Sequence, residues 1–313
     1  MTGKESRTSI AKKIWAMALV MLLVSGGAAT FFVWRPPTLS KEQSILIDSL
    51  AESVSEVERM STQVRVALFD AQLDRGEATK DFKRLLDAEP LFACKTVSPV
   101  DIQAGSLRAF DCIIFPGGNA RMQAEALGDD GKVNVRKFVQ SGGGYIGICG
   151  GAFLATAKYD WGMALVDAKP LTGQIEVPGQ GMVSIAWRGA GTVRMELSDA
   201  GGKIFTDVPG LVDVWYSGGP ILSPAEMTDL PKYVSLAVFR TEVWDYKLQQ
   251  GTMIDTPAIV AGRFGKGRVL LFSPHPEMTP GLESIVRRAV LATARTHARE
   301  TERTPATRRR REL

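Results

Sequence analysis

A cysteine enclosed by glycines is the feature of this 313-residue chain that most clearly indicates chemistry. The apolar segment Gly144 to Ile148 predicts a strand, and it runs directly into Cys149, Gly150 and Gly151. This pattern is typical of a nucleophile elbow, a sharp strand-to-helix turn that strains its central residue and tolerates nothing bulky beside it. At a helix N-terminus the cysteine is favoured as the thiolate, the form that attacks carbonyl carbon.

The base predicted for this cysteine is His275. The chain has only one other histidine, His297, which lies in a charged C-terminal tail. His275 follows the apolar segment Arg268 to Phe272, which predicts a strand, and Glu277 comes two residues later. The order cysteine, histidine, carboxylate suits a catalytic triad in which His275 removes the thiol proton and Glu277 fixes the imidazole tautomer.

Four stretches of the sequence resemble the class I glutamine amidotransferase superfamily, most closely the N-terminal, amidotransferase-like domain of biotin-protein ligases. They are Phe115–Ala120, Gly142–Cys149, Tyr216–Pro220 and Ser273–Glu277. The resemblance covers residues 63–294. It implies an α/β, flavodoxin-like, doubly wound and mostly parallel sheet, whose ligands bind where the strands end.

The resemblance also implies roles for residues around the predicted triad. The backbone N–H groups of Gly118 and Gly150 are expected to form an oxyanion hole, although a plain strand-end turn is the alternative for the first of these loops. Substrate contacts are expected from Gly117, Asn119, Phe153, Tyr216 and Ser217. Trp215, next to Tyr216, could share in this substrate face, with burial in a β-sandwich core as the alternative for both aromatic residues. No cofactor is expected, and a single histidine without a paired cysteine motif argues against a metal site.

The sequence departs from the glutaminases of this superfamily at Phe153. Those enzymes carry a glutamine there, and an aromatic ring cannot make the hydrogen bonds of an amide. Glutamine hydrolysis is therefore not expected, and hydrolysis of another amide or ester, in a small-molecule or peptide-like substrate, is the preferred hypothesis. Two alternatives stay open: a pocket of the same fold that binds a ligand without turnover, and a membrane-tethered interaction protein.

Alternating strands and helices have to position these residues. Strands are predicted at 65–69, 95–97, 111–115, 258–263 and 268–272, and helices at 79–88, 133–140 and 282–294. Such alternation favours a parallel sheet with right-handed crossovers. Between residues 166 and 248 short β-rich segments, for example 182–187 and 234–239, alternate with Gly and Pro turns, which predicts an insertion that walls the pocket.

An uncharged, mostly apolar segment at residues 14–34 follows a basic segment at 1–13. Its 21 residues span about 31 Å as a helix, close to the thickness of a bilayer, with Trp15 and Trp34 at its two ends. The positive-inside rule then leaves the N-terminus in the cytoplasm and places the domain outside it. The alternative is a signal peptide cleaved within 25–29, which would release a secreted protein.

Residues 35–62 predict a helix between this segment and the domain. Ser40 to Gln43 is a capping-box pattern, and apolar residues then recur at three- and four-residue spacing, at Ile47, Leu50, Val54 and Val57. Such a stripe suits either a short stalk or linker, open to pairing two chains as a homodimer, or a helix that packs against the domain.

The formal charge of +4 is concentrated at the two ends of the chain, in residues 1–13 and in a tail at 295–313 with Arg308 to Arg311 in a row. The middle is therefore mildly acidic, which argues against a nucleic-acid-binding face. Cys94 and Cys112 are expected as small hydrophobic residues, with a disulfide between them as the alternative. An oxidising compartment would count against a catalytic Cys149.

Overall fold

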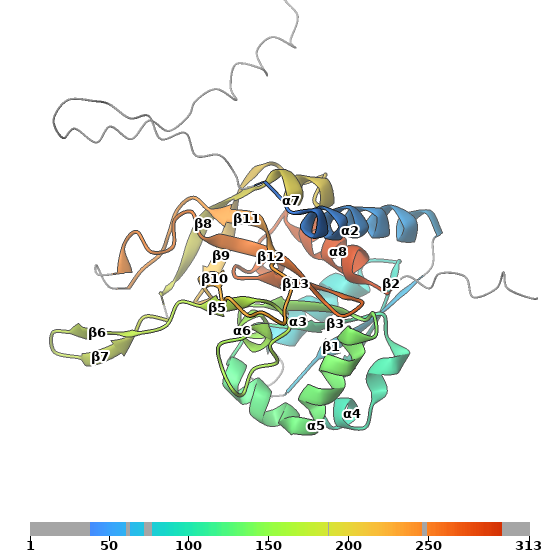
Figure 1. Cartoon of the computed structure of the whole chain (residues 1–313), viewed down its shortest axis with the longest axis horizontal. Coiled ribbons are helices and arrows are strands. Elements are labelled where there is room, and N and C mark those ends of the chain that lie inside the picture. Colours follow the sequence, from blue (N-terminus) through green and yellow to red (C-terminus); the bar gives the residue numbers. More distant parts are fainter. Residues whose placement is uncertain (1–37, 61–62, 72–76, 187, 246–248, 296–313) are drawn as a thin grey trace, which may run out of the picture. The chain divides into compact units, whose positions relative to one another are not determined.

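A mixed sheet runs through the described part of the chain, which in this computed structural model comprises residues 38–60, 63–71, 77–186, 188–245 and 249–295 (Figure 1). Within this part the sheet has nine strands in the order β2-β1-β3-β4-β13-β12-β11-β8-β9. The first five are β2 (Phe92–Val97), β1 (Val64–Phe69), β3 (Cys112–Phe115), β4 (Gly144–Ile148) and β13 (Gly267–Phe272). Each of these five is parallel to its neighbour. The expected α/β class with a parallel central sheet is confirmed.

The order of the parallel strands brings the predicted catalytic residues together. Numbered as they occur along the chain, these strands lie in the order 2-1-3-4-5, one of the two common orders of doubly wound folds. β3, β4 and β13 are adjacent, and they lead into Gly117, Cys149 and His275, respectively. Because the strands are parallel, these three residues emerge at the same edge of the sheet.

The same sheet continues with four antiparallel strands. The first, β12 (Pro257–Phe264), is the strand predicted at 258–263, and the other three come from the predicted insertion: β11 (Val234–Phe239), β8 (Ala190–Leu197) and β9 (Leu211–Ser217). Two short ladders lie outside it: β5 (Ala168–Pro170) with β10 (Leu222–Pro224), and the hairpin of β6 (Gln174–Val177) and β7 (Gly181–Ser184). The strand predicted at 182–187 is therefore part of a separate hairpin, and its Trp187 lies outside the described residues.

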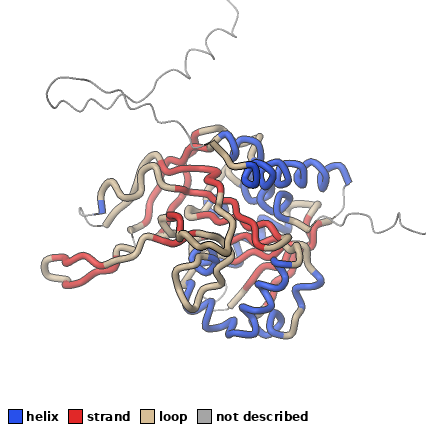
Figure 2. The backbone as a smooth tube through the Cα atoms, in the orientation of Figure 1, coloured by secondary structure: helices blue, strands red, loops and turns tan. Residues whose placement is uncertain are grey.

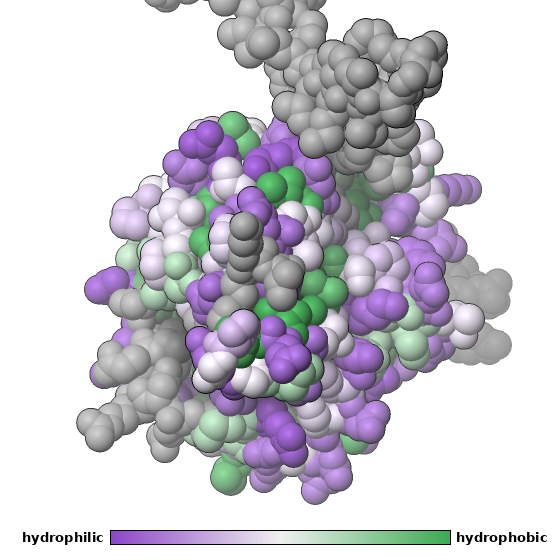
Figure 3. Space-filling view, turned by 90° about the vertical axis from the view of Figure 1, so that its left-hand side faces the viewer, coloured by the Kyte–Doolittle hydropathy of each residue, from purple (hydrophilic) through white to green (hydrophobic). Residues whose placement is uncertain are grey.

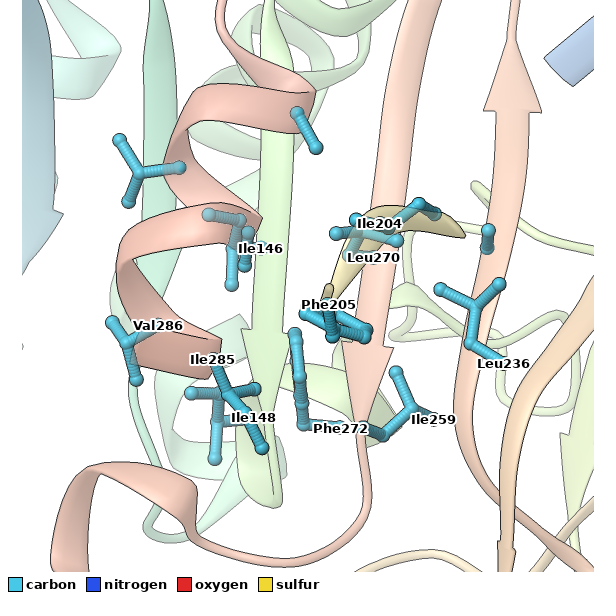
Figure 4. Close-up of a cluster of buried hydrophobic side chains, with 14 of the residues drawn as sticks. Ile146, Ile148, Ile204, Phe205, Leu236, Ile259, Leu270, Phe272, Ile285 and Val286 are labelled. Atoms are coloured by element: carbon cyan, nitrogen blue, oxygen red, sulfur yellow. The ribbon is translucent and has the colours of Figure 1, made fainter. Parts of the chain in front are cut away.

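Helices cover both faces of the sheet, as Figure 2 shows. On one face lie α2 (Lys41–Met60), α3 (Glu77–Asp87), α7 (Asp199–Ile204) and α8 (Glu283–Thr293), and on the other α4 (Pro99–Gln103), η1 (Ser106–Ala109), α5 (Ala120–Gln140) and α6 (Gly150–Ala155). Alternate strand residues face the two layers. In β4, Ile146 and Ile148 pack in the first core, close to α8 in Figure 4, and Tyr145 packs in the second.

The helix predicted between the membrane segment and the domain, α2, packs into the domain and is not a free stalk or linker. Its apolar stripe, Ile47, Leu50, Val54 and Val57, is buried against the first core. Ser53 Oγ, also buried, donates a hydrogen bond to Leu291 O in α8 at 2.9 Å. The stripe is therefore used within the chain and is not free to pair two chains.

The expected disulfide alternative between Cys94 and Cys112 is wrong. Both residues pair with Val66 of β1, one from each side, so that β1 lies between them. Two strand spacings amount to about 9.6 Å, whereas the Cα atoms of a disulfide are at most about 6.8 Å apart. Both cysteines are free, as is Cys149.

The predicted membrane segment at 14–34, the basic segment at 1–13 and nearly all of the tail lie outside the described residues. Among the helices that the structure does describe, none combines the length and the apolar character needed to cross a bilayer.

Candidate active site

The turn after β4 has the strained backbone that a nucleophile elbow requires. Cys149 has φ 49° and ψ −103°, a backbone conformation that residues other than glycine rarely adopt. It is held by hydrogen bonds from Cys149 N to Phe272 O at 2.8 Å and from Phe153 N to Cys149 O at 3.0 Å. A Cβ atom at Gly150 would lie 2.2 Å from Gly118 O, so only glycine fits there. The neighbouring loops thus fix Cys149 at the carboxyl end of β4.

The predicted histidine and carboxylate form a buried pair. His275 follows β13, and its backbone N–H donates to Trp215 O at 2.7 Å. The short helix η3 (Pro276–Met278) turns Glu277 back, so that Glu277 Oε1 lies 2.7 Å from His275 Nδ1. The two side chains are only 7% and 4% exposed. A carboxylate at Nδ1 leaves Nε2 as the nitrogen available for proton transfer.

Cys149 and His275 meet over Gly117. A Cβ atom at Gly117 would lie 2.8 Å from His275 Cε1 and 3.6 Å from Cys149 Cβ. The Cys149 thiol donates to Ser217 O at 3.4 Å, and His275 Nε2 is buried without a hydrogen-bond partner in the described part of the chain. The structure thus brings all three predicted catalytic side chains together, with the Cys149 sulfur beside both the imidazole and the carbonyl oxygen of Ser217.

The surroundings of His275 favour its protonated form. Burial by itself lowers the pKa of His275, but the neighbouring Cys149 thiol and the hydrogen bond and charge of Glu277 outweigh it. Together these interactions raise the pKa of His275 from 6.5 to about 10. The ring is therefore an imidazolium at neutral pH, and a positive charge beside a cysteine stabilises a thiolate.

The two N–H groups predicted for an oxyanion hole are free in the described part of the chain, where neither Gly118 N nor Gly150 N has a hydrogen-bond acceptor. Gly118 has φ 117°, a conformation suited to glycine, and it abuts Gly150 directly. The next residue, Asn119, caps α5, because its Oδ1 accepts a hydrogen bond from Met122 N at 3.1 Å. Two unpaired donors next to the cysteine are what an oxyanion would need.

An open pocket of about 780 Å³ lies over these residues. The predicted residues Gly118, Asn119, Cys149, Phe153, Ser217 and His275 line it. Gly117, Gly150 and Glu277 are not part of the lining and support these residues from behind. The described part of the chain contains no group of three or more His, Cys, Asp or Glu side chains that could hold a metal ion.

The expectation that Tyr216 contacts substrate is wrong. Tyr216 is fully buried, donates a hydrogen bond to Gly219 O at 2.7 Å and packs edge-to-face on Phe239. Successive side chains of a strand point to opposite faces, so in β9 it is Trp215 that faces the pocket. The alternative of a core position therefore holds for Tyr216.

Several pocket residues were not predicted as site residues from the sequence. Tyr159 and Trp161 lie in the loop after α6, and Met278 ends η3. The rings of Tyr159 and Trp161 stack at 4.4 Å with 11° between their planes. The only sequence signal was two aromatic residues, two positions apart, soon after the elbow helix.

Known proteins resemble this chain to very different extents. An uncharacterized protein of Chlamydia muridarum is 26% identical over 196 residues, 60% of this chain and 66% of that protein, so the chain spans just under two thirds of this relative. A cytoplasmic protein of Salmonella typhimurium has 12% identity and a TM-score of 0.47, covering 74% of this chain and 100% of that one. A β-galactosidase of Bacillus circulans has 13% identity and a TM-score of 0.42, and the match covers 73% of this chain and 31% of that enzyme. Structural likenesses this distant support no argument about function.

A family profile gives the firm assignment. The profile described as the N-terminal region of biotin-protein ligase matches residues 76–311, well over half of the chain and including the elbow, the His275–Glu277 pair and every residue that lines the pocket. The chain therefore belongs to the biotin-protein ligase N-terminal family.

Proposed function

We propose that this protein is a membrane-anchored, exported cysteine hydrolase of the amidotransferase-like type, which cleaves an amide or ester with Cys149, His275 and Glu277. The observation that carries the proposal is how the two ring nitrogens of His275 are bonded and buried. Its Nδ1 is bound to Glu277, its Nε2 is buried without a partner in the described residues, and both lie beside a strained cysteine at the bottom of a pocket. A packing histidine would have a partner on each side.

The proposed reaction starts from the thiolate–imidazolium pair, in which the thiol proton of Cys149 has already passed to His275 Nε2. The Cys149 sulfur then bonds to the carbonyl carbon, and the N–H groups of Gly118 and Gly150 stabilise the negative oxygen. The C–N or C–O bond breaks as the imidazolium gives its proton to the leaving nitrogen or oxygen. His275 next takes a proton from water, the water oxygen bonds to the thioester carbon, and the C–S bond breaks to release the acid.

Selective labelling of cysteine tests the proposal. We expect iodoacetamide at neutral pH to modify Cys149 of the full-length chain far faster than Cys94 or Cys112, as read by peptide mass spectrometry. Burial raises the pKa of Cys94 to about 11, and Cys112 is fully buried, so both serve as internal controls. His275→Ala should slow modification of Cys149 by about tenfold or more, because an unassisted cysteine is only a few per cent thiolate at neutral pH.

His297→Ala is the matched control, since it removes the only other histidine of the chain. Equal rates in the parent and in His275→Ala would contradict an activated nucleophile. A screen of amides, esters and peptides, with Cys149→Ser as the blank, then identifies the reaction.

A ligand-binding protein without turnover is the second candidate. It is favoured by the hydrogen bond from the Cys149 thiol to Ser217 O, which competes with the imidazole for the thiol proton. It predicts slow labelling of Cys149 together with tight binding in the pocket.

A further inference from the structure

Four aromatic rings line the pocket beside Cys149. The stacked pair Tyr159 and Trp161 comes from the loop after α6, Phe153 from α6 itself and Trp215 from the end of β9. Met278, half exposed, adds a thioether. Such rings offer broad apolar faces that favour stacking with another flat group.

We propose that the substrate carries a planar, apolar, uncharged group next to its reactive carbonyl, and that Trp161 and Trp215 recognise this group. The proposal rests on the function proposed above and names its substrate class. Glutamine does not fit this description, because its side chain is small and ends in an amide.

The aromatic platform is built into the fold. Gly162 N donates to Tyr159 O at 2.8 Å, which closes a turn between the two stacked rings, and Met163 N donates to Leu154 O at 2.8 Å, which ties the turn to α6. Partial burial raises the pKa of Tyr159, as expected for a ring held against the protein. A platform fixed before binding loses little conformational entropy when a ligand stacks on it.

The charges of the pocket disfavour a cationic substrate. Among the described residues that line it, none is Asp or Glu. The one guanidinium is that of Arg121, which is exposed and paired with Glu125 at 2.9 Å. Glu277 is buried behind His275 and bound to it. A positive group would therefore gain no carboxylate partner there, and its attraction to the ring faces would have to offset both its lost hydration and the nearby His275 imidazolium.

A sugar also stacks on aromatic rings, but its hydroxyl groups need hydrogen-bonding partners. The Asn119 side-chain oxygen is already used by Met122 N, and Ser217 O accepts the Cys149 thiol. A sugar would therefore find two of the pocket's hydrogen-bond acceptors already used.

Binding to the full-length Cys149→Ala variant, which cannot form a thioester, tests the proposal by calorimetry. We expect phenylacetamide to bind about tenfold or more tightly than acetamide, since an aromatic contact adds both stacking and apolar burial. The cationic 4-(aminomethyl)phenylacetamide and N-acetylglucosamine should both bind more weakly than phenylacetamide.

Trp161→Ala should remove most of the preference for phenylacetamide over acetamide, and Trp161→Phe should keep it. Trp244→Ala is the matched control, because Trp244 is exposed and does not line the pocket. Equal binding of phenylacetamide and acetamide, or tighter binding of N-acetylglucosamine, would overturn the proposal, as would an unchanged preference in Trp161→Ala.

This test is independent of turnover. If Cys149 is not labelled selectively but phenylacetamide is still preferred, the hydrolase proposal is contradicted and the planar apolar ligand class stands. If Cys149 is labelled selectively but phenylacetamide is not preferred, only the proposed ligand class is contradicted.

Discussion

The buried pair of His275 and Glu277 links the stability of the fold to pH. The pKa of His275 lies at about 10 in the folded chain, above its ordinary value of 6.5, so the folded state holds a proton that the unfolded state loses first. This contribution is fully present below pH 6.5 and is lost as the pH rises toward about 10. We expect the free energy of unfolding to fall across this window, by at most about 1.4 kcal/mol per pH unit from this group.

Glu277→Gln separates this effect from other groups that titrate at alkaline pH. The amide keeps the shape of the carboxylate but removes the charge that raises the pKa of His275. Urea unfolding between about pH 6.5 and about 10 should therefore give a flatter dependence for the variant than for the parent chain. If the free energy of unfolding depended on pH equally in the parent and in Glu277→Gln, Glu277 would not be what keeps His275 protonated.

The helix α2 is expected to contribute to the stability of the domain at the level of a whole element. Leu50 is fully buried in the first core, whereas Ile45 on the same helix is half exposed. Leu50→Ala should lower the free energy of unfolding by about 2–5 kcal/mol, because it removes apolar burial and leaves a cavity. Ile45→Ala, the matched control, should change it by less than about 0.5 kcal/mol.

Urea denaturation of the full-length variants measures both changes. If Leu50→Ala were as mild as Ile45→Ala, α2 would not be an integral part of the fold.

The sequence predicts elements well where one face of an element carries all its apolar residues. The stripe Ile47, Leu50, Val54 and Val57 is buried as a set, although only the folded chain shows that its partner is α8. The first half of α5 was missed because Gly128 breaks the helical backbone, with φ 61° and ψ −177°. Local pattern thus identifies the buried face of an element but not what covers it.

The site shows the same division. Residue type and spacing were enough to predict that Cys149, His275 and Glu277 lie together, because each follows a strand whose end could be placed at one edge of the sheet. The choice between Trp215 and Tyr216 depends on which face of β9 meets the pocket, and that follows from the pairing of β9 with β8 in the folded sheet. The platform of Tyr159 and Trp161 lies in a loop, where no periodicity marks it.

At the scale of the whole molecule, we propose that residues 14–34 anchor the domain in a membrane with the N-terminus in the cytoplasm. The proposal is supported by the uncharged run of 21 residues and its basic flank. Full-length protein should fractionate with membranes and resist alkaline carbonate extraction. A reporter enzyme that is active only outside the cytoplasm should be active when it is fused after residue 313.

Leu22→Arg tests the anchor directly. A charge at the centre of a spanning helix costs about 2.5–3.5 kcal/mol of insertion free energy, so the variant should shift from the membrane to the soluble fraction. Leu39→Arg is the matched control, because Leu39 lies beyond the apolar run and is 37% exposed. A cleaved signal peptide predicts instead a shortened, soluble chain from the parent sequence. Equal distribution of both variants and the parent in the soluble fraction, at full length, would contradict the anchor.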